Sequence, residues 1–177
     1  MKIAISGLSG CGNTTTSTIL SKKLGFPLVN FTFRNLAKER GVTLEELSEE
    51  AKHNSEIDKE LDSRQAAMAR ESENAILASR LAIWMLPEAD IKVYLEASEK
   101  TRAERIMRRE GGTLEYQTET TRKRDAENCE RYLNIYGIDF AKYDFADLII
   151  QTDGKTAEQV ADIILDYIGK TKKIKET

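Results

Sequence analysis

The stretch "GLSGCGNTT", from Gly7 to Thr15, decides the fold of this chain. It follows the short apolar run "KIAIS" and opens a segment of helical period that ends at Gly25, which is the strand, loop and helix context that makes a phosphate-binding glycine loop credible. The glycines permit a tight turn, so that successive backbone N–H groups and the helix N-terminus face an anion. The predicted phosphate-binding residues are Gly7, Leu8, Ser9, Gly10, Cys11, Gly12, Asn13, Thr14 and Thr15.

Asn13 stands where such loops normally carry a lysine, whose charge would lie at the transferred phosphate. The backbone donors of the loop survive this change. Thr14 is placed to give its hydroxyl to Mg²⁺, and Thr15 can donate a hydrogen bond to a phosphate oxygen. The alternative is an ordinary Gly-Ser turn, and the coincidence of strand, spacing and helix favours the phosphate loop.

Length and composition exclude several classes of protein. A chain of 177 residues, 40% apolar and 32% charged, predicts one soluble globular domain. The net charge of −3 argues against a general nucleic-acid binder. Cys11 and Cys129 have no partners at metal-ligand spacing, so we expect a reduced, cytoplasmic protein. We expect no membrane insertion, since no run of about 18 apolar residues occurs.

Short apolar runs alternate with longer segments of helical period, which predicts an α/β fold. The predicted strands are residues 2–6, 27–31, 75–79, 91–97 and 147–152. Several of them are nearly all apolar, as expected for parallel strands with helices on both faces. A last helix is predicted over 157–168, ending at Gly169. Two polar helical stretches, 41–72 and 109–137, fall outside the alternation, and we interpret them as mobile inserts over the sheet.

Two groups of arginines could replace the missing lysine charge. Arg105 and Arg109 are four residues apart on one helix face that leads into a Gly-Gly pair, with Arg102 nearby. Arg124 and Arg131 are seven apart on a second face. Such faces could close over a triphosphate and stabilise the phosphoryl group in flight. Solvated helix faces are the alternative, which the glycine loop and hinge disfavour.

An ordered set of motifs resembles the archaeal-type cytidylate kinases, within the nucleoside-monophosphate (NMP) kinases. The motifs are "GLSGCGNTT", "FRNLAKERGVTLEELSEEA", "EIDKELDSRQ", "ASRLAIWM", "ADIKVYLEA", "RAERIMRREGG" and "RYLNIYGID". The resemblance implies a single domain over 1–177 with a three-layer P-loop kinase fold, a five-stranded parallel sheet, a helical NMP-binding segment (about 32–72) and a lid (about 109–131). It also implies an enzyme that uses Mg²⁺ and ATP to phosphorylate CMP, and dCMP as well. We expect a monomer, because no long apolar stripe in the sequence is left unaccounted for.

The resemblance assigns roles to residues on the donor side. Arg105 resembles the residue that packs against adenine. Arg109 and Arg124 resemble the pair that clamps the transferring phosphates, and Gly154 belongs to the loop expected near adenine. In this branch a hydroxyl residue often replaces the loop lysine, so the absence of lysine at Asn13 resembles a feature of the family.

On the acceptor side, Arg34 resembles the arginine that grips the monophosphate, a task suited to a planar bidentate fork. Arg80 matches an arginine at a strand end that faces CMP, and Arg131 resembles one shared between donor and acceptor. Asn128 lies where related enzymes often carry a carboxylate that holds the pyrimidine nucleotide. The family's "EGR" or "DGR" is Ala78-Ser79-Arg80 here, so a carboxylate that could order a metal-bound water is missing.

One further helix face is a candidate for acceptor binding. The face carries Asp58, Asp62 and Gln65, which could accept hydrogen bonds from cytosine N4 or from ribose hydroxyls. The alternative is that these side chains form a solvated helix surface. Arg64 on the same helix is a further candidate.

Two alternatives to a cytidylate kinase stay open. One is a kinase for UMP, dTMP or AMP, since arginines grip any phosphate. The other is a nucleotide-binding module without turnover, which the residues at positions 13 and 78 motivate.

Overall fold

The computed structural model describes residues 1–175, and it contains one parallel sheet of five strands with the order β2-β3-β1-β4-β5. The strands are β1 Lys2–Gly7, β2 Leu28–Val29, β3 Ala75–Ala78, β4 Ile91–Glu96 and β5 Leu148–Gln151. β1 is central and pairs in parallel with β3 and β4. The predicted α/β class with a five-stranded parallel sheet is confirmed.

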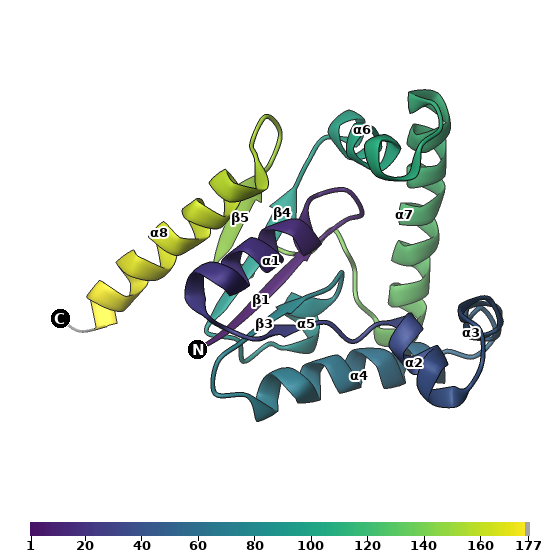
Figure 1. Cartoon of the computed structure of the whole chain (residues 1–177), viewed down its shortest axis with the longest axis horizontal. Helices are drawn as coiled ribbons and strands as arrows, with labels where there is room; N and C mark the ends of the chain where they lie inside the picture. The colour runs from purple at the N-terminus through teal and green to yellow at the C-terminus, as the bar shows by residue number, and fades with distance from the viewer. Residues whose placement is uncertain (176–177) are drawn as a thin grey trace.

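Helices cover both faces of the sheet, which makes three layers (Figure 1). They are α1 Asn13–Leu24, α2 Phe33–Arg40, α3 Leu44–Ala51, α4 Glu56–Glu71, α5 Ala82–Met85, α6 Glu99–Glu110, α7 Leu114–Tyr136 and α8 Ala157–Lys175. Helices α1 and α8 pack on one face, and α4 and α5 pack on the other. No helix among residues 1–175 is long and apolar enough to cross a membrane.

The apolar character of β1 follows from its burial on both faces. Ile3 and Ile5 lie in the cluster formed with α1 and α8, whereas Ala4 between them lies in the cluster with α4 and α5. All three side chains are fully buried. Side chains that alternate between two buried faces must all be apolar, which explains the run in "KIAIS".

Two predicted boundaries differ from the structure by more than one residue. The strand predicted over 27–31 is limited to Leu28 and Val29, because Phe31 leaves the sheet and packs into a separate cluster with α2, α3 and α4. Helix α8 does not end at Gly169 but continues to Lys175. Gly169 does not adopt a positive φ, so it does not provide the left-handed turn that ends α1 at Gly25.

The two polar stretches form helical arms at one end of the sheet. Figure 1 shows α6 and α7, the α6–α7 arm, on one side of this end. Helices α2 and α3 and the start of α4 lie on the other side and form the α2–α3 arm. The loops that follow β1, β3, β4 and β5 meet between these arms, because the carboxyl ends of parallel strands share one edge. The order reverses beside β1, so this edge is where an α/β sheet of this kind binds ligands.

Candidate active site

The loop between β1 and α1 has the backbone of a phosphate cradle. Gly10 has φ +86°, and a Cβ there would lie 2.8 Å from the carbonyl oxygen of Arg102 and 2.9 Å from its Cα. Only glycine therefore allows α6 to pack this close to the loop. Gly12, with φ +103°, precedes the first residue of α1, so the free N–H groups of the helix N-terminus open directly onto the loop.

Asn13 closes the loop instead of extending a charge toward a ligand. Its Nδ2 donates to the carbonyl oxygen of Gly7 at 2.8 Å, across the base of the cradle. Its Oδ1 is buried, and no described protein group donates to it. The next two residues, Thr14 and Thr15, are exposed at the start of α1 and line the adjoining cleft. The loop therefore keeps its backbone and hydroxyl donors but has no cation of its own.

Two arginines of α6 hold the loop from behind. Arg105 Nη1 donates to the carbonyl oxygens of Gly10 and Cys11 at 3.1 and 3.3 Å, and its Nη2 donates to the carbonyl of Thr152 at 2.8 Å. Arg102 Nη1 donates to the carbonyl oxygen of Ser9 at 3.2 Å. Three successive loop carbonyls are thus turned toward α6. This arrangement leaves the loop N–H groups for an anion.

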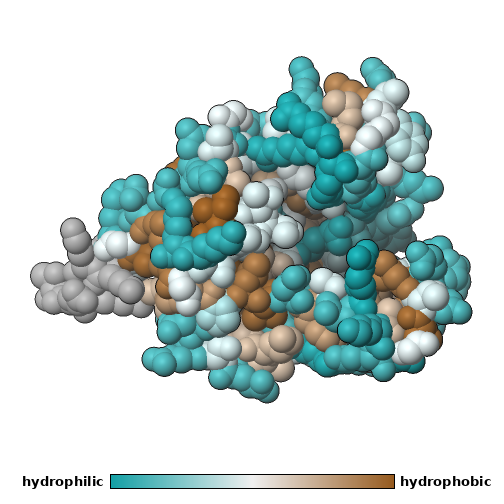
Figure 2. Space-filling view, in the orientation of Figure 1, coloured by the Kyte–Doolittle hydropathy of each residue, from teal (hydrophilic) through white to brown (hydrophobic). Residues whose placement is uncertain are grey.

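A cleft of about 490 Å³ lies in front of the loop. Figure 2 shows the surface hollowed on this side between the α6–α7 arm and the α2–α3 arm, with hydrophilic side chains along its upper edge. All nine predicted loop residues line the cleft. Its cationic lining residues are Arg80, Arg105, Arg109, Arg124 and Lys155, and none of the described residues that line it is a carboxylate. A site with this field attracts a polyanion such as a triphosphate.

The cationic side chains that line the cleft differ in how firmly they are held. Arg80 Nη2 donates to Ser9 Oγ at 2.9 Å, which fixes it beside the loop. Arg109 is 63% exposed and pairs with the neighbouring Glu110. Arg124 on α7 lies 3.9 Å from the same carboxylate. These two arginines reach the cleft from the arm with little to hold them.

Lys155 was not predicted from the sequence. It lies in the loop after β5, which also contains Gly154, and its side chain lines the cleft. The available signal was a cation in the short loop after the last apolar strand, at the sheet edge where the phosphate loop also lies.

The loop after β5 is anchored to α6 by Asp153. Its carboxylate accepts from the backbone N–H of Ser98 at 2.9 Å, from Ser98 Oγ at 2.6 Å, and from the hydroxyl of Thr101. These hydrogen bonds lower the pKa of Asp153 to about 2. Gly154 follows with φ +68°, so the chain turns back toward α8 without strain.

Arg131 does not line the cleft but joins α7 to α4. Its Nε donates to Asp58 Oδ2 at 3.0 Å, and its Nη2 contacts the same carboxylate and donates to the carbonyl of Ala51 at 3.1 Å. Burial raises the pKa of Asp58, and Arg131 opposes that shift. The sequence placed these two residues in different arms, and the structure brings them together.

One turn along each helix, Tyr136 donates to Asp62 Oδ2 at 2.7 Å. Burial raises the pKa of Asp62 to about 6, and the hydrogen bond from Tyr136 opposes this shift. Asn128 is half-buried on α7. Gln65, on the same side of α4, donates to the carbonyl oxygen of Phe31 at 2.6 Å, so it supports the chain between β2 and α2.

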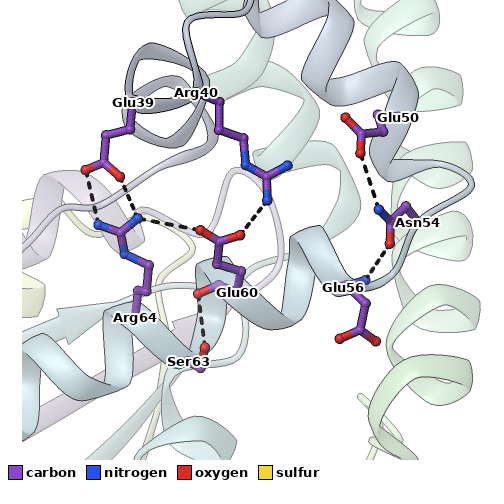
Figure 3. Close-up of polar contacts among 8 residues, drawn as sticks. All are labelled: Glu39, Arg40, Glu50, Asn54, Glu56, Glu60, Ser63 and Arg64. Atoms are coloured by element: carbon purple, nitrogen blue, oxygen red, sulfur yellow. Dashed lines mark hydrogen bonds and ion pairs between the residues drawn. The ribbon is translucent and has the colours of Figure 1, made fainter.

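Arg64 lies outside the cleft, in an ion-pair network between α2 and α4 (Figure 3). Its Nη1 and Nη2 donate to the two carboxylate oxygens of Glu39 at 2.6 and 3.1 Å, and Glu60 lies 3.6 Å away. Its guanidinium also lies 4.2 Å from the ring centroid of Phe31. Arg34, near the start of α2, is exposed. The structure therefore leaves Arg34 free to move toward a ligand and engages Arg64.

The oxygens of the cleft suit a magnesium ion that enters with a nucleotide. No group of three or more His, Cys, Asp and Glu side chains in the described part of the chain could hold a metal ion. Thr14, where phosphate loops place a metal-binding hydroxyl, is exposed at the cleft. Magnesium prefers oxygen ligands, retains several waters and often binds through substrate phosphates. The lining therefore fits Mg²⁺ as part of a magnesium–triphosphate complex.

The solved structures that share the fold include two kinases of small molecules. A shikimate kinase from Bacteroides thetaiotaomicron matches with a TM-score of 0.65 at 16% identity, over 96% of this chain and 98% of that one. A deoxyadenosine kinase from M. mycoides with bound dATP matches with a TM-score of 0.57 at 22% identity, over 96% of this chain and all of that one. At these identities the likeness establishes the P-loop kinase fold alone.

Sequence comparison gives a closer relationship. A cytidylate kinase from Pyrococcus furiosus is 42% identical over an alignment that covers 98% of this chain and 94% of the relative. Cytidylate kinase 2 from Borreliella afzelii is 42% identical over 96% of this chain and 97% of its own length. The model of the cytidylate kinase-like family matches residues 2–154, which include the loop, both arms and Gly154. The chain belongs to the cytidylate kinase-like family.

Proposed function

We propose that this protein transfers the γ-phosphoryl group of magnesium-bound ATP to CMP, with dCMP as a second acceptor, giving ADP and the nucleoside diphosphate. The observation that carries the proposal is the cleft in which a backbone phosphate cradle faces five cationic side chains and no carboxylate. Membership of the cytidylate kinase-like family supports cytidine monophosphate as the acceptor.

In this proposal the loop N–H groups and the N-terminus of α1 bind the β-phosphate of ATP, and Thr15 adds a hydroxyl donor. Magnesium, when bound with ATP beside the Thr14 hydroxyl, neutralises part of the triphosphate charge. Arg105 and Lys155 lie where the loop after β5 borders the cleft, which suits contacts to the adenosine side of the donor. The donor would thus be held chiefly by preformed groups.

On the acceptor side, Arg34 and Arg80 would bind the phosphate of CMP, and Asp58, Asp62 and Asn128 would contact its nucleoside. A phosphate oxygen of CMP attacks the γ-phosphorus in line, and the bond from that phosphorus to the oxygen of the leaving ADP breaks. Arg109, Arg124 and Arg131 would stabilise the charge on the phosphoryl group in flight when the α6–α7 arm closes. Phosphoryl transfer requires positioning and electrostatics more than covalent chemistry, so a loop without lysine can support it.

The test is coupled ADP release with Mg-ATP against CMP, dCMP, UMP, dTMP and AMP in parallel. We expect turnover with CMP and dCMP and at least about ten-fold lower kcat/KM with the other acceptors, because only the base pocket distinguishes them. Preference for another monophosphate would identify a different NMP kinase. Binding of ATP without acceptor-dependent ADP release would leave a nucleotide-binding module.

We further propose that the protein acts as a monomer in the cytoplasm, where its two free cysteines stay reduced. Light scattering at working concentration tests the first part, and a mass of about 20.0 kDa is expected.

A further inference from the structure

A buried ion pair lies at the junction of α6, α7 and the phosphate loop. Arg102 on α6 is 7% exposed, and its Nη1 donates to Asp125 Oδ2 on α7 at 2.6 Å. The same nitrogen donates to the carbonyl oxygen of Ser9 in the loop at 3.2 Å. One atom of Arg102 therefore bonds both the arm and the cradle.

Both residues of the Arg102–Asp125 pair lie next to groups that line the cleft. On the loop side, Gly10 packs directly against the backbone of Arg102, so a shift of α6 is passed to the loop through van der Waals contact. On the arm side, Asp125 directly follows Arg124, which lines the cleft. The distance from the loop to Arg124 thus depends on the pair.

Stability alone is a poor account of this pair. Arg102 Nε and Asp125 Oδ1 are buried, and no described protein group bonds to either atom. A buried ion pair with unsatisfied atoms recovers little of its desolvation cost, and apolar side chains of the same size would often stabilise a fold as well. Such a pair can instead favour one relative position of the elements that it joins, which here are α6, α7 and the phosphate loop.

The same two helices provide an internal contrast. Arg122 on α7 donates to both carboxylate oxygens of Glu99 on α6, at 2.5 and 2.6 Å. This second pair is much more exposed, with Arg122 68% and Glu99 35% accessible, and Arg122 is not among the residues that line the cleft. It joins the helices of the arm without contacting the loop.

We infer that Arg102 and Asp125 are a positioning pair for phosphoryl transfer, which sets Arg124 on α7 against the phosphate loop through the carbonyl of Ser9. The inference rests on the proposed kinase function. Arg102 positions both the loop and the arm, whereas Asp125 positions the arm alone. The two residues therefore have separable effects on ATP binding and on turnover.

The experiment compares Asp125→Asn, Asp125→Glu and Arg102→Lys with Glu99→Gln as the matched control, using wild-type protein that has first been shown to turn over CMP. Turnover is measured by ADP release, and the affinity for ATP by calorimetry, at a temperature where circular dichroism shows every variant folded. The wild-type assay decides the proposed function, and the variants decide the positioning role.

We expect Asp125→Asn to lower kcat by about ten-fold or more while the Kd for ATP stays within about three-fold, because misplaced groups slow chemistry more than binding. Asp125→Glu should recover part of that loss. Arg102→Lys should lower kcat and also weaken ATP binding, and Glu99→Gln should change neither. Wild-type kcat in folded Asp125→Asn, or an equal loss in Glu99→Gln, would overturn the inference.

Discussion

Three successive carbonyls of the phosphate loop accept hydrogen bonds from buried Arg102 and half-buried Arg105 of α6. By contrast, the ion-pair partner of Arg109 and Arg124 among the described residues is the single carboxylate of Glu110. The loop is thus preformed, and the arm arginines are free to move. Preformed groups bind a ligand without a reorganisation cost, and mobile groups can engage only when a ligand has arrived. We therefore expect the loop to govern ATP binding and the arm to govern turnover.

The largest effects are expected for substitutions of the cleft arginines on the α6–α7 arm. Arg109→Ala and Arg124→Ala should each lower kcat by about 100-fold, as expected when charge stabilisation in the transition state is lost. The Kd for ATP should change much less. Lys123→Ala is the control, since this exposed neighbour of Arg124 is paired, within the described part of the chain, with Glu127 on its own helix. Near-wild-type turnover of both arginine variants would show that the arm does not participate.

A second test contrasts two arginines of the acceptor side. Arg34→Ala should raise the KM for CMP by about ten-fold or more, since a charged hydrogen bond to phosphate is lost. Arg64→Ala should change that KM by less than about two-fold, because its guanidinium is already engaged by Glu39 and Glu60. Steady-state kinetics with CMP as the varied substrate measure both values. An equal rise of the KM for CMP in the two variants would show that Arg64 also takes part in acceptor binding.

The partly buried carboxyl group of Asp62 on α4 should affect the pH dependence of stability. Its pKa in the folded protein, about 6, is above the usual value of 3.8, so the folded state holds the proton more tightly than the unfolded chain. The contribution of Asp62 to stability is therefore greatest at low pH and declines as the pH rises from about 4 to about 6. Asp62→Asn removes this decline, and it should raise Tm by a few degrees at about pH 7.5, with a smaller gain near pH 4.

Thermal unfolding across this pH range measures the effect, with the exposed Asp166→Asn on α8 as the control. The same Asp62 variant should raise the KM for CMP if the carboxylate contacts the acceptor. A lower Tm near neutral pH would mean that the Tyr136 hydrogen bond outweighs the cost of burying the charge.

The smallest effect is expected for Asn13→Lys. The amide of Asn13 closes the loop on Gly7, and five cations already face the cleft, so an added charge should change kcat by less than about three-fold. Steady-state kinetics decide the point. A large gain would mean that the lysine-free loop is impaired, and the contrast between a complete loop and a mobile arm would then fail.

The sequence predicted the sheet and the loop well because their signals are local. Short apolar runs marked all five strands, and the spacing of glycines and threonines marked the loop between β1 and α1. The pairing of Arg131 with Asp58 was not predictable, because the two residues lie 73 positions apart on different arms. The sequence presents Arg102 only as one arginine among several, since nothing in "TRAERIM" indicates which guanidinium turns toward Ser9. Arg64 was assigned to the acceptor for the same reason, and its network with α2 depends on tertiary packing.

The burial of Cys11 has a consequence for the chemical durability of the site. Burial raises the pKa of this thiol to about 11 and shields it from solvent. Partial burial also raises the pKa of Cys129 on α7, but that thiol is partly accessible. Because the thiolate is the form that reacts, peroxide and alkylating agents should spare the cradle and modify α7 first. A protein with a cysteine at the centre of its phosphate loop can therefore keep that loop intact during oxidative stress.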